Sequence, residues 1–285
     1  MAFEVQPLSA TLGARVTGVS LETLTDATWH DVLTAFHDHA LLVFPNQHLS
    51  ASAQLAFAKR FGEIEVMTKN TPTLTLTNRS PSGDRLSDDD DRTLFSRGNE
   101  GWHTDSSYMP LTAKASVVSA HVVPSSGGQT QWADARAAFE ALDDETRERI
   151  GELTAYHSYF YSQAKIGHKV AVGSEYGFFE GEHPLHPLVK VHSITGRPAL
   201  YIGRHISQIP GLDDDETQAL LTRLTTLTCT SPRIVSHQWE VGDVVVWDNR
   251  CLLHRARPCD DRKARVLMHT RVKGDRASET ALNYR

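Results

Sequence analysis

The sequence predicts a mainly β fold, a β-barrel or jelly roll with helical cover. Three observations lead to this prediction. Short apolar segments recur through the second half of the chain, turn residues separate them, and helical periodicity lies mostly in the N-terminal half and in one later insertion. Neither an internal repeat nor linker composition interrupts the 285 residues. We therefore expect one domain over residues 1–285.

The N-terminal half alternates short strands with two helices. Residues 1–20 have the pattern of short strands joined by glycines, and Asp26 begins an amphipathic helix. The apolar run at residues 40–44 is typical of a buried strand. Ser50 is placed to cap a second helix, which ends before Gly62.

Residues 79–101 change character, because Ser, Pro, Gly and four consecutive aspartates (88–91) dominate them. This composition favours a long loop, which we expect to act as a lid, with the aspartates on a solvated surface. Strand patterns then prevail, with helices expected near 134–153 and around the leucines at 220–227. The expected strands cover residues 115–122, 199–203, 243–248 and 265–273.

The composition excludes several classes of protein. A net charge of −6 and a pI near 6.2 give no basic face for nucleic acid. No apolar run reaches the roughly 20 residues of a membrane span, and the N-terminus lacks a signal-peptide pattern. The three cysteines are too few for a disulfide framework and favour a reducing compartment. We expect a cytoplasmic protein that binds neither nucleic acid nor membrane.

Three side chains form a candidate metal site. His103 and Asp105 are two residues apart, a spacing that places both on one face of a strand while Thr104 points away. His254 follows the β-forming run at 244–247 and supplies a distant third ligand. Two imidazoles and one carboxylate are the ligand set of non-haem Fe(II) oxygenases. A Zn- or Mn-dependent cupin-like hydrolase or isomerase, or a non-catalytic β-protein with an accidental His-x-Asp, remains open at this point.

An iron site with open positions needs an electron donor, and 2-oxoglutarate can serve. Its distal carboxylate requires a cation, for which the planar fork of arginine is well suited. Arg265 is the best candidate, since it begins a strand that we expect to run antiparallel beside the His254 segment. The other nearby arginines are expected at the surface or on the substrate side: Arg255, Arg257, Arg262 and Arg271.

At this point the residues resemble a known family, that of taurine dioxygenase and 2,4-dichlorophenoxyacetate dioxygenase. The resemblance runs from Pro7 to Asp275, and the herbicide-degrading branch looks closer. It implies a double-stranded β-helix, or jelly roll, with helical additions. The motifs that carry it are Leu42-Val43-Phe44, Arg60-Phe61-Gly62, Trp102-His103-Thr104-Asp105-Ser106-Ser107, Pro124-Ser125-Ser126-Gly127-Gly128-Gln129-Thr130 and Trp247-Asp248-Asn249-Arg250 with His254.

The resemblance implies the cofactors and the residues that hold them. It implies Fe(II), with 2-oxoglutarate as co-substrate and O₂ as the oxidant. His103, Asp105 and His254 match the iron ligands. Arg265 and Thr130 match the arginine and the threonine that bind the distal carboxylate of 2-oxoglutarate. No catalytic residue is expected beyond the metal centre.

The substrate side is less well defined. Asn99 and Ser106 match positions that face the substrate in the taurine enzyme. The second arginine of that enzyme, which holds the sulfonate, is replaced here by His269, and Arg271 lies two residues further on the same strand face. Taurine is therefore disfavoured. Lys69 lies near a substrate-side lysine of the herbicide branch, and its alternative is a solvated surface amine.

Asp105 favours hydroxylation, because related halogenases replace the iron carboxylate with a small residue. We predict hydroxylation of a small, anionic organic substrate, with an aryloxyalkanoate-like acid favoured. If the attacked carbon bears an ether or sulfate oxygen, the product falls apart and a C–O bond is cleaved. The alternatives within the family are a sulfonate or alkyl-sulfate dioxygenase and a biosynthetic hydroxylase. A homo-oligomer, dimer or tetramer, is expected from the family.

Overall fold

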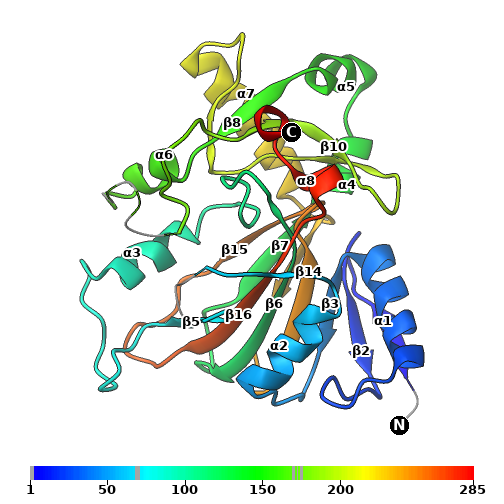
Figure 1. Cartoon of the computed structure of the whole chain (residues 1–285), viewed down its shortest axis with the longest axis vertical. Coiled ribbons are helices and arrows are strands. Elements are labelled where there is room, and N and C mark those ends of the chain that lie inside the picture. Colours follow the sequence, from blue (N-terminus) through cyan, green and yellow to red (C-terminus); the bar gives the residue numbers. More distant parts are fainter. Residues whose placement is uncertain (1–2, 68–70, 169–170, 172, 174–175) are drawn as a thin grey trace.

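The computed structural model describes residues 3–67, 71–168, 171, 173 and 176–285. Its largest feature is a twisted sheet in which β5 (Leu74–Thr77) pairs with β16 beside the main path (Figure 1). All neighbours in it are antiparallel except β2 and β3. The main path runs in the order β1 (Glu4–Pro7), β2 (Ala14–Thr17), β3 (Leu41–Phe44), β14 (Val244–Asp248), β6 (Ala113–Val122), β16 (Val266–Lys273) and β4 (Ile64–Glu65).

A smaller sheet of β13 (Ile234–His237), β7 (Thr130–Asp134) and β15 (Leu252–Ala256) packs on the large one. Trp132 of β7 is fully buried between the sheets, with its ring centroid 5.6 Å from that of Trp247 on β14. Two packed sheets that share one apolar core are the architecture of a jelly roll. The predicted fold class is confirmed.

Strand β14 explains why its sequence is a continuous apolar run. Val245 and Trp247 belong to the core between the two sheets, whereas Val244 and Val246 belong to a second core on the other face. A strand buried on both faces needs apolar residues at every position. The second core lies under α1 (Asp26–His39) and α2 (Ala51–Lys59). Ser50 accepts a hydrogen bond from the Ala53 amide, so the predicted cap of α2 is confirmed.

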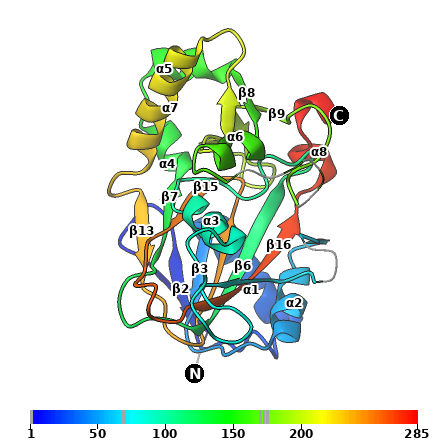
Figure 2. The ribbon, with the colours of Figure 1, turned by 90° about the vertical axis from the view of Figure 1, so that its left-hand side faces the viewer.

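The remaining elements gather at one end of the two sheets (Figures 1 and 2). Among the described residues, none of the helices is long and apolar enough to cross a bilayer. The elements at this end are α4 (Ala135–Glu140), α5 (Asp144–Gly151), β8 (Thr154–His157), α6 (Tyr159–Ala164), β9 (Leu185–Pro187), β10 (Val189–Val191), β11 (Pro198–Leu200), β12 (Ile206–Gln208), α7 (Asp214–Thr228), α8 (Arg276–Glu279) and the 3₁₀ turn η1 (Leu282–Tyr284).

Two expectations about local structure are wrong. Strand β16, which follows Arg265, lies in the large sheet beside β4, β5 and β6, and not beside the His254 strand β15. Residues 79–101 are not all loop, because α3 (Asp91–Gly98) forms inside them. Asp90 accepts a hydrogen bond from the Arg92 amide and caps this helix, so part of the aspartate run starts a helix.

Candidate active site

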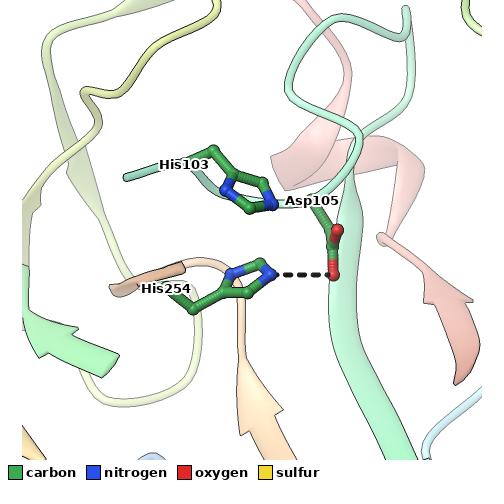
Figure 3. Close-up of side chains that lie close together, drawn as sticks. All are labelled: His103, Asp105 and His254. Atoms are coloured by element: carbon green, nitrogen blue, oxygen red, sulfur yellow. Dashed lines mark ion pairs between the residues drawn. The ribbon is translucent and has the colours of Figure 1, made fainter. Parts of the chain in front are cut away.

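His103, Asp105 and His254 come together inside the barrel (Figure 3). One ligand atom from each lies within 4.8 Å of the others, and all three residues are buried. Two backbone hydrogen bonds hold His103 and His254 side by side. The His254 amide of β15 donates to the His103 carbonyl at 2.7 Å, and the His103 amide donates to the His254 carbonyl at 3.0 Å. The two imidazole centroids are consequently 4.2 Å apart.

Asp105 reaches the site from a turn and not from a strand, which corrects the sequence-based expectation. Only His103 makes a β-bridge, and the turn begins at Asp105. Ser106 has a left-handed backbone (φ 57°), an uncommon conformation for a non-glycine residue that is often found at functional sites. Thr104 points away, as predicted, and donates to the Asn249 carbonyl at 2.7 Å.

A group of polar side chains orients the Asp105 carboxylate. Ser116 of β6 donates to its Oδ2 at 2.6 Å. The side-chain Nδ2 of Asn249 donates to the Ser116 hydroxyl at 2.9 Å. Its side-chain Oδ1 accepts from the Asp105 backbone amide at 3.3 Å and from the Trp247 indole at 2.9 Å. Asn249 and Trp247 of the Trp-Asp-Asn motif therefore help to fix the orientation of the carboxylate.

The protonation states suit a metal ion. Burial lowers the pKa of His103 to about 4, and it lowers the pKa of His254 well below its usual value, so both imidazoles are neutral at pH 7. The Nδ1 of His103 lies 2.8 Å from the Gly101 carbonyl, which leaves Nε2 free for a ligand. Burial would raise the pKa of Asp105, but Arg271 and the nearby histidines lower it well below its usual value. Two neutral imidazoles and an ionised carboxylate fit a divalent first-row metal.

The three candidate ligands face a central cavity of about 70 Å³. One wall is the face of β16 and the residue before it, where alternate side chains point inward: Arg265, Leu267, His269 and Arg271. Thr130, Trp239 and Trp247 line the cavity as well. Arg265 and Arg271 lie on the same wall and contribute two cations to one small space.

Arg265 has no acidic partner among the described residues. Its Nη2 donates to the neutral Gly128 carbonyl at 3.2 Å, and its Nε is shielded from solvent without a hydrogen-bond partner. Beside it, the Thr130 hydroxyl accepts from the Trp239 indole at 2.9 Å and so still has its own proton to donate. An unpaired guanidinium next to a free hydroxyl donor fits a carboxylate ligand.

Arg271 is buried in a polar cluster. Its Nη2 lies 2.7 Å from Asp105 Oδ1, and its Nη1 donates to the Ser106 and Tyr108 hydroxyls at 3.3 Å each. Its Nε is buried without a hydrogen-bond partner. Glu65, the partner of Arg271 across β4 and β16, accepts from Ser106 at 2.7 Å, and burial raises the pKa of this carboxyl. Arg271 can therefore still donate one hydrogen bond to a ligand.

Next to the central cavity lies a larger one of about 550 Å³, here called the apolar cavity. Arg271 lines both cavities, so a cation stands where they join. A ligand with an aromatic body and one carboxylate matches this combination of surfaces. Asp91 and Arg92 line part of the apolar cavity, but its large side chains are predominantly apolar and aromatic, among them Met67, Leu74, Phe95, Tyr108, Tyr159 and Tyr176.

The structure places the other predicted substrate residues at different distances from the centre. Asn99 and His269 line the central cavity, and His269 Nε2 lies 3.4 Å from Asp105 Oδ2. Ser106 is fully buried and contacts Arg271 and Glu65. Lys69 lies outside the described residues.

Sequence reasoning missed Glu65 and Tyr176. The Tyr176 hydroxyl donates to the Glu65 carboxylate, and its oxygen lies 3.3 Å from the Ser106 hydroxyl oxygen. These residues are separated by 111 positions and lie in no motif, so no local pattern signals their contact. Tyr108, which directly follows the Trp102–Ser107 motif, is a further residue that the sequence does not identify, and it accepts a hydrogen bond from Arg271.

Solved structures of similar proteins share this arrangement of elements. A crystal structure of AAD-2 in complex with Mn(II) and N-oxalylglycine superposes with a TM-score of 0.90 at 33% sequence identity. The match covers 98% of this chain and 99% of that one. The similarity therefore extends over the whole fold and is not confined to the metal centre.

Sequence comparisons agree. An (S)-phenoxypropionate/alpha-ketoglutarate-dioxygenase of Sphingobium herbicidovorans is 51% identical, covering 99% of this chain and 98% of the relative. One of Delftia acidovorans is 48% identical over 98% and 97%. A 2,4-dichlorophenoxyacetate dioxygenase of Cupriavidus pinatubonensis is 32% identical over 96% and 99%.

The model of the family described as taurine catabolism dioxygenase TauD, TfdA family, matches residues 4–271. The predicted reaction class, with Fe(II), 2-oxoglutarate and O₂ as its requirements, is confirmed with the family. The chain belongs to the TauD/TfdA family and is an Fe(II)- and 2-oxoglutarate-dependent dioxygenase.

Proposed function

We propose that this dioxygenase cleaves (S)-2-aryloxypropionates into a phenol and pyruvate. The observation that carries the proposal is the position of Arg271, a buried cation at the junction between the metal ligands and the apolar cavity. A 2-aryloxypropionate has a carboxylate for Arg271 and an aromatic ring for the cavity. The names of the two relatives at 51% and 48% identity support this class of acid and the (S) configuration.

Five residues hold the metal and the co-substrate in this proposal. His103, Asp105 and His254 bind Fe(II), and their depressed pKa values keep them ready as ligands at neutral pH. Arg265 and Thr130 hold the distal carboxylate of 2-oxoglutarate through charge-assisted and hydroxyl hydrogen bonds. The bound iron, with 2-oxoglutarate and O₂, supplies the oxidising chemistry.

The chain's own contribution on the other side is to orient the acid. Arg271 donates from its free Nε to the substrate carboxylate, while Ser106 and Tyr108 hold the guanidinium in place. The aryl ring packs among Phe95 and its aromatic neighbours, which exclude water. With both ends of the acid fixed, the carbon between carboxylate and ether oxygen lies toward the metal ligands.

The chemistry balances with one O₂. One oxygen atom enters succinate as 2-oxoglutarate loses CO₂, and the other replaces the C2–H bond of the acid with a hydroxyl. The C2 carbon then bears both a hydroxyl and an aryl ether. When this hemiketal collapses, the C2–O bond to the aryl group breaks and the hydroxyl proton passes to the departing aryloxide, which leaves phenol and the C2 carbonyl of pyruvate.

The proposal also covers the domain, the lid, the residues around the substrate, and the assembly and location of the protein. We propose that residues 1–285 form one dioxygenase domain and that the segment 79–101, with α3 inside it, acts as a lid. Asn99, Ser106 and His269 are proposed to shape the substrate site around Arg271. We also propose a cytoplasmic homo-oligomer, a dimer or tetramer, which light scattering of the purified protein tests directly.

The test is turnover on a matched panel of acids with Fe(II), ascorbate and 2-oxoglutarate. The panel contains (S)- and (R)-2-phenoxypropionate, phenoxyacetate, taurine and a short alkyl sulfate. We expect equal amounts of phenol, pyruvate and succinate from the (S)-acid, and a much lower rate from its mirror image. Faster succinate formation with the alkyl sulfate would contradict the proposed substrate in favour of a sulfate-ester dioxygenase, the activity named for a relative at 31% identity.

A further inference from the structure

A third cavity of about 240 Å³, here called the polar cavity, lies beside the central one. It runs between the segment 76–100 and the segment 256–265. Its lining contrasts with that of the apolar cavity, since most of its long side chains are charged: Arg85, Asp88, Arg97, Glu100, Arg257 and Asp261.

The two outer cavities meet the central one at different arginines. Arg265 and Ala256 line the central and the polar cavity, whereas Arg271 lines the central and the apolar cavity. Leu76 of β5 and Ser96 of α3 line all three. Strand β5 and helix α3 therefore form a partition, with one arginine at the inner end of each outer cavity.

The walls of the polar cavity are tied to each other away from this partition. Arg79 donates to the Asp261 and Arg262 carbonyls at 2.9 and 2.8 Å, and Asn78 donates to the Lys263 carbonyl at 2.8 Å. Asn78 also accepts from the Arg265 amide at 2.9 Å. The path to Arg265 thus runs between two segments that are joined by hydrogen bonds between the Asn78 and Arg79 side chains and backbone groups of residues 261–265.

The cations of the polar cavity divide into paired and unpaired ones. Arg97 pairs with Asp88 at 3.0 Å, and Arg85 pairs with Asp88 and Asp261. Arg257, exposed at the outer part, has no ion pair among the described residues, and neither does Arg265 at the inner end. An anion that enters this cavity meets one free guanidinium outside and another inside.

We propose that the polar cavity is the passage for the dicarboxylate co-substrate and its product succinate, and that the aryloxy acid uses the apolar cavity. The inference rests on the proposed function, because it assigns Arg265 to 2-oxoglutarate and Arg271 to the acid. Moving a dianion along aromatic walls would strip it of water without compensation, whereas charged walls and water replace that hydration. Succinate can then leave and 2-oxoglutarate can enter through the polar cavity while an aryloxy acid occupies the apolar cavity.

Two threonines provide a matched pair of variants. Thr93 on α3 lines the polar cavity alone, and Thr75 on β5 lines the apolar cavity alone, among the three cavities. Thr93→Phe narrows the first passage and Thr75→Phe narrows the second. Stopped-flow fluorescence of Trp239 and Trp247, which line the central cavity, follows 2-oxoglutarate binding to the Mn(II)-loaded protein without turnover.

We expect Thr93→Phe to slow 2-oxoglutarate association and dissociation several-fold and about equally, so that the dissociation constant barely changes. Thr75→Phe should leave both rates unchanged and slow the binding of (S)-2-phenoxypropionate. Arg257→Gln, an exposed change that spares folding, should lower the 2-oxoglutarate association rate and weaken its dependence on salt.

Two outcomes overturn the inference. If Thr75→Phe slows 2-oxoglutarate while Thr93→Phe and Arg257→Gln keep the wild-type rates, the co-substrate uses the apolar cavity, and the proposed function stands. If the wild-type Mn(II) protein does not bind 2-oxoglutarate at all, the inference and the proposed function both fall.

Discussion

Arg265 and Arg271 line the same wall of one cavity, and yet their surroundings are opposite. Arg265 touches a neutral carbonyl and has no acidic partner among the described residues. Arg271 is paired with the Asp105 carboxylate at 2.7 Å and is bonded to two hydroxyls. Both have a buried Nε without a hydrogen-bond partner.

This difference indicates how each arginine becomes available. Arg265 is available to an anion with or without a metal, because no acidic side chain in the described part of the chain pairs with its guanidinium. The charge of Arg271 is balanced by a residue that also belongs to the metal site. A divalent ion on Asp105 competes with Arg271 for that carboxylate, so metal loading should free Arg271 for a substrate anion.

The largest expected effect comes from removing the shared residue. Asp105→Ala deletes a metal ligand and the partner of Arg271 together. We expect metal affinity to fall more than about 100-fold, beyond the 10- to 100-fold typical of changes to residues that only support a ligand. Titration with Mn(II) followed by calorimetry measures it. Ser116→Ala, which removes only the hydroxyl that donates to Asp105, is the control and should cost less. Near-native metal affinity in Asp105→Ala would contradict the metal assignment.

Arg265→Ala should raise the KM for 2-oxoglutarate about 10- to 100-fold, since a hydrogen bond to a charged group contributes about 1.5–3 kcal/mol. Steady-state kinetics with varied 2-oxoglutarate measures the change. Metal affinity and the KM for the aryloxy acid should stay near their wild-type values. An unchanged 2-oxoglutarate KM would remove Arg265 from its role.

Metal removal should affect the substrate side through Arg271. We expect the metal-free protein to bind (S)-2-phenoxypropionate about tenfold more weakly than the Mn(II) protein, because Asp105 then keeps Arg271 paired; about 1.4 kcal/mol corresponds to that factor. Calorimetric titration of both forms with the acid, without 2-oxoglutarate, gives the comparison. The account of Arg271 is wrong if the metal-free form binds the acid equally well or better.

His157, which lies away from both arginines, should affect the stability of the fold without affecting the active site. Burial, with Lys190 nearby, lowers the pKa of His157 to about 3, and neither ring nitrogen has a hydrogen-bond partner. Its folded pKa lies below the unfolded value near 6.5, so unfolded chains bind more protons between pH 6.5 and 3. This residue therefore makes stability fall with falling pH, by up to about 1.4 kcal/mol per pH unit in that window.

The variant His157→Gln should reduce this slope in denaturant unfolding of the metal-free protein. Turnover at pH 7 should change little, because His157 is not among the residues lining the three cavities. An identical pH slope in both proteins would show that His157 titrates normally in the folded state.

The convergence of His103, Asp105 and His254 could be predicted from sequence, because metal chemistry restricts residue types and spacing. His103 and Asp105 lie two residues apart, and a second histidine after a strand completes a known ligand set. The geometry was only half foreseen, since Asp105 extends from a turn. The partner of β16, the strand that follows Arg265, is not predictable from neighbouring sequence, because β-strand pairing depends on the whole sheet.

The substrate side could not be predicted in the same way. Glu65 and Tyr176 meet across 111 residues, and each carries an ordinary local sequence. Helix α3 is not predictable from composition, because the aspartates that cap and begin it are also typical of a loop. Surfaces assembled from distant segments leave no local pattern, whereas ligand sets do.

The separate roles of the two arginines are tested most directly by measuring two dissociation constants in matched variants. Arg265→Lys and Arg271→Lys keep the charge and lose the planar fork. Each Mn(II)-loaded protein is titrated with 2-oxoglutarate and, separately, with (S)-2-phenoxypropionate. We predict that Arg265→Lys weakens only 2-oxoglutarate and that Arg271→Lys weakens only the aryloxy acid. Equal weakening of both ligands by either variant would contradict the division of the site between the two arginines.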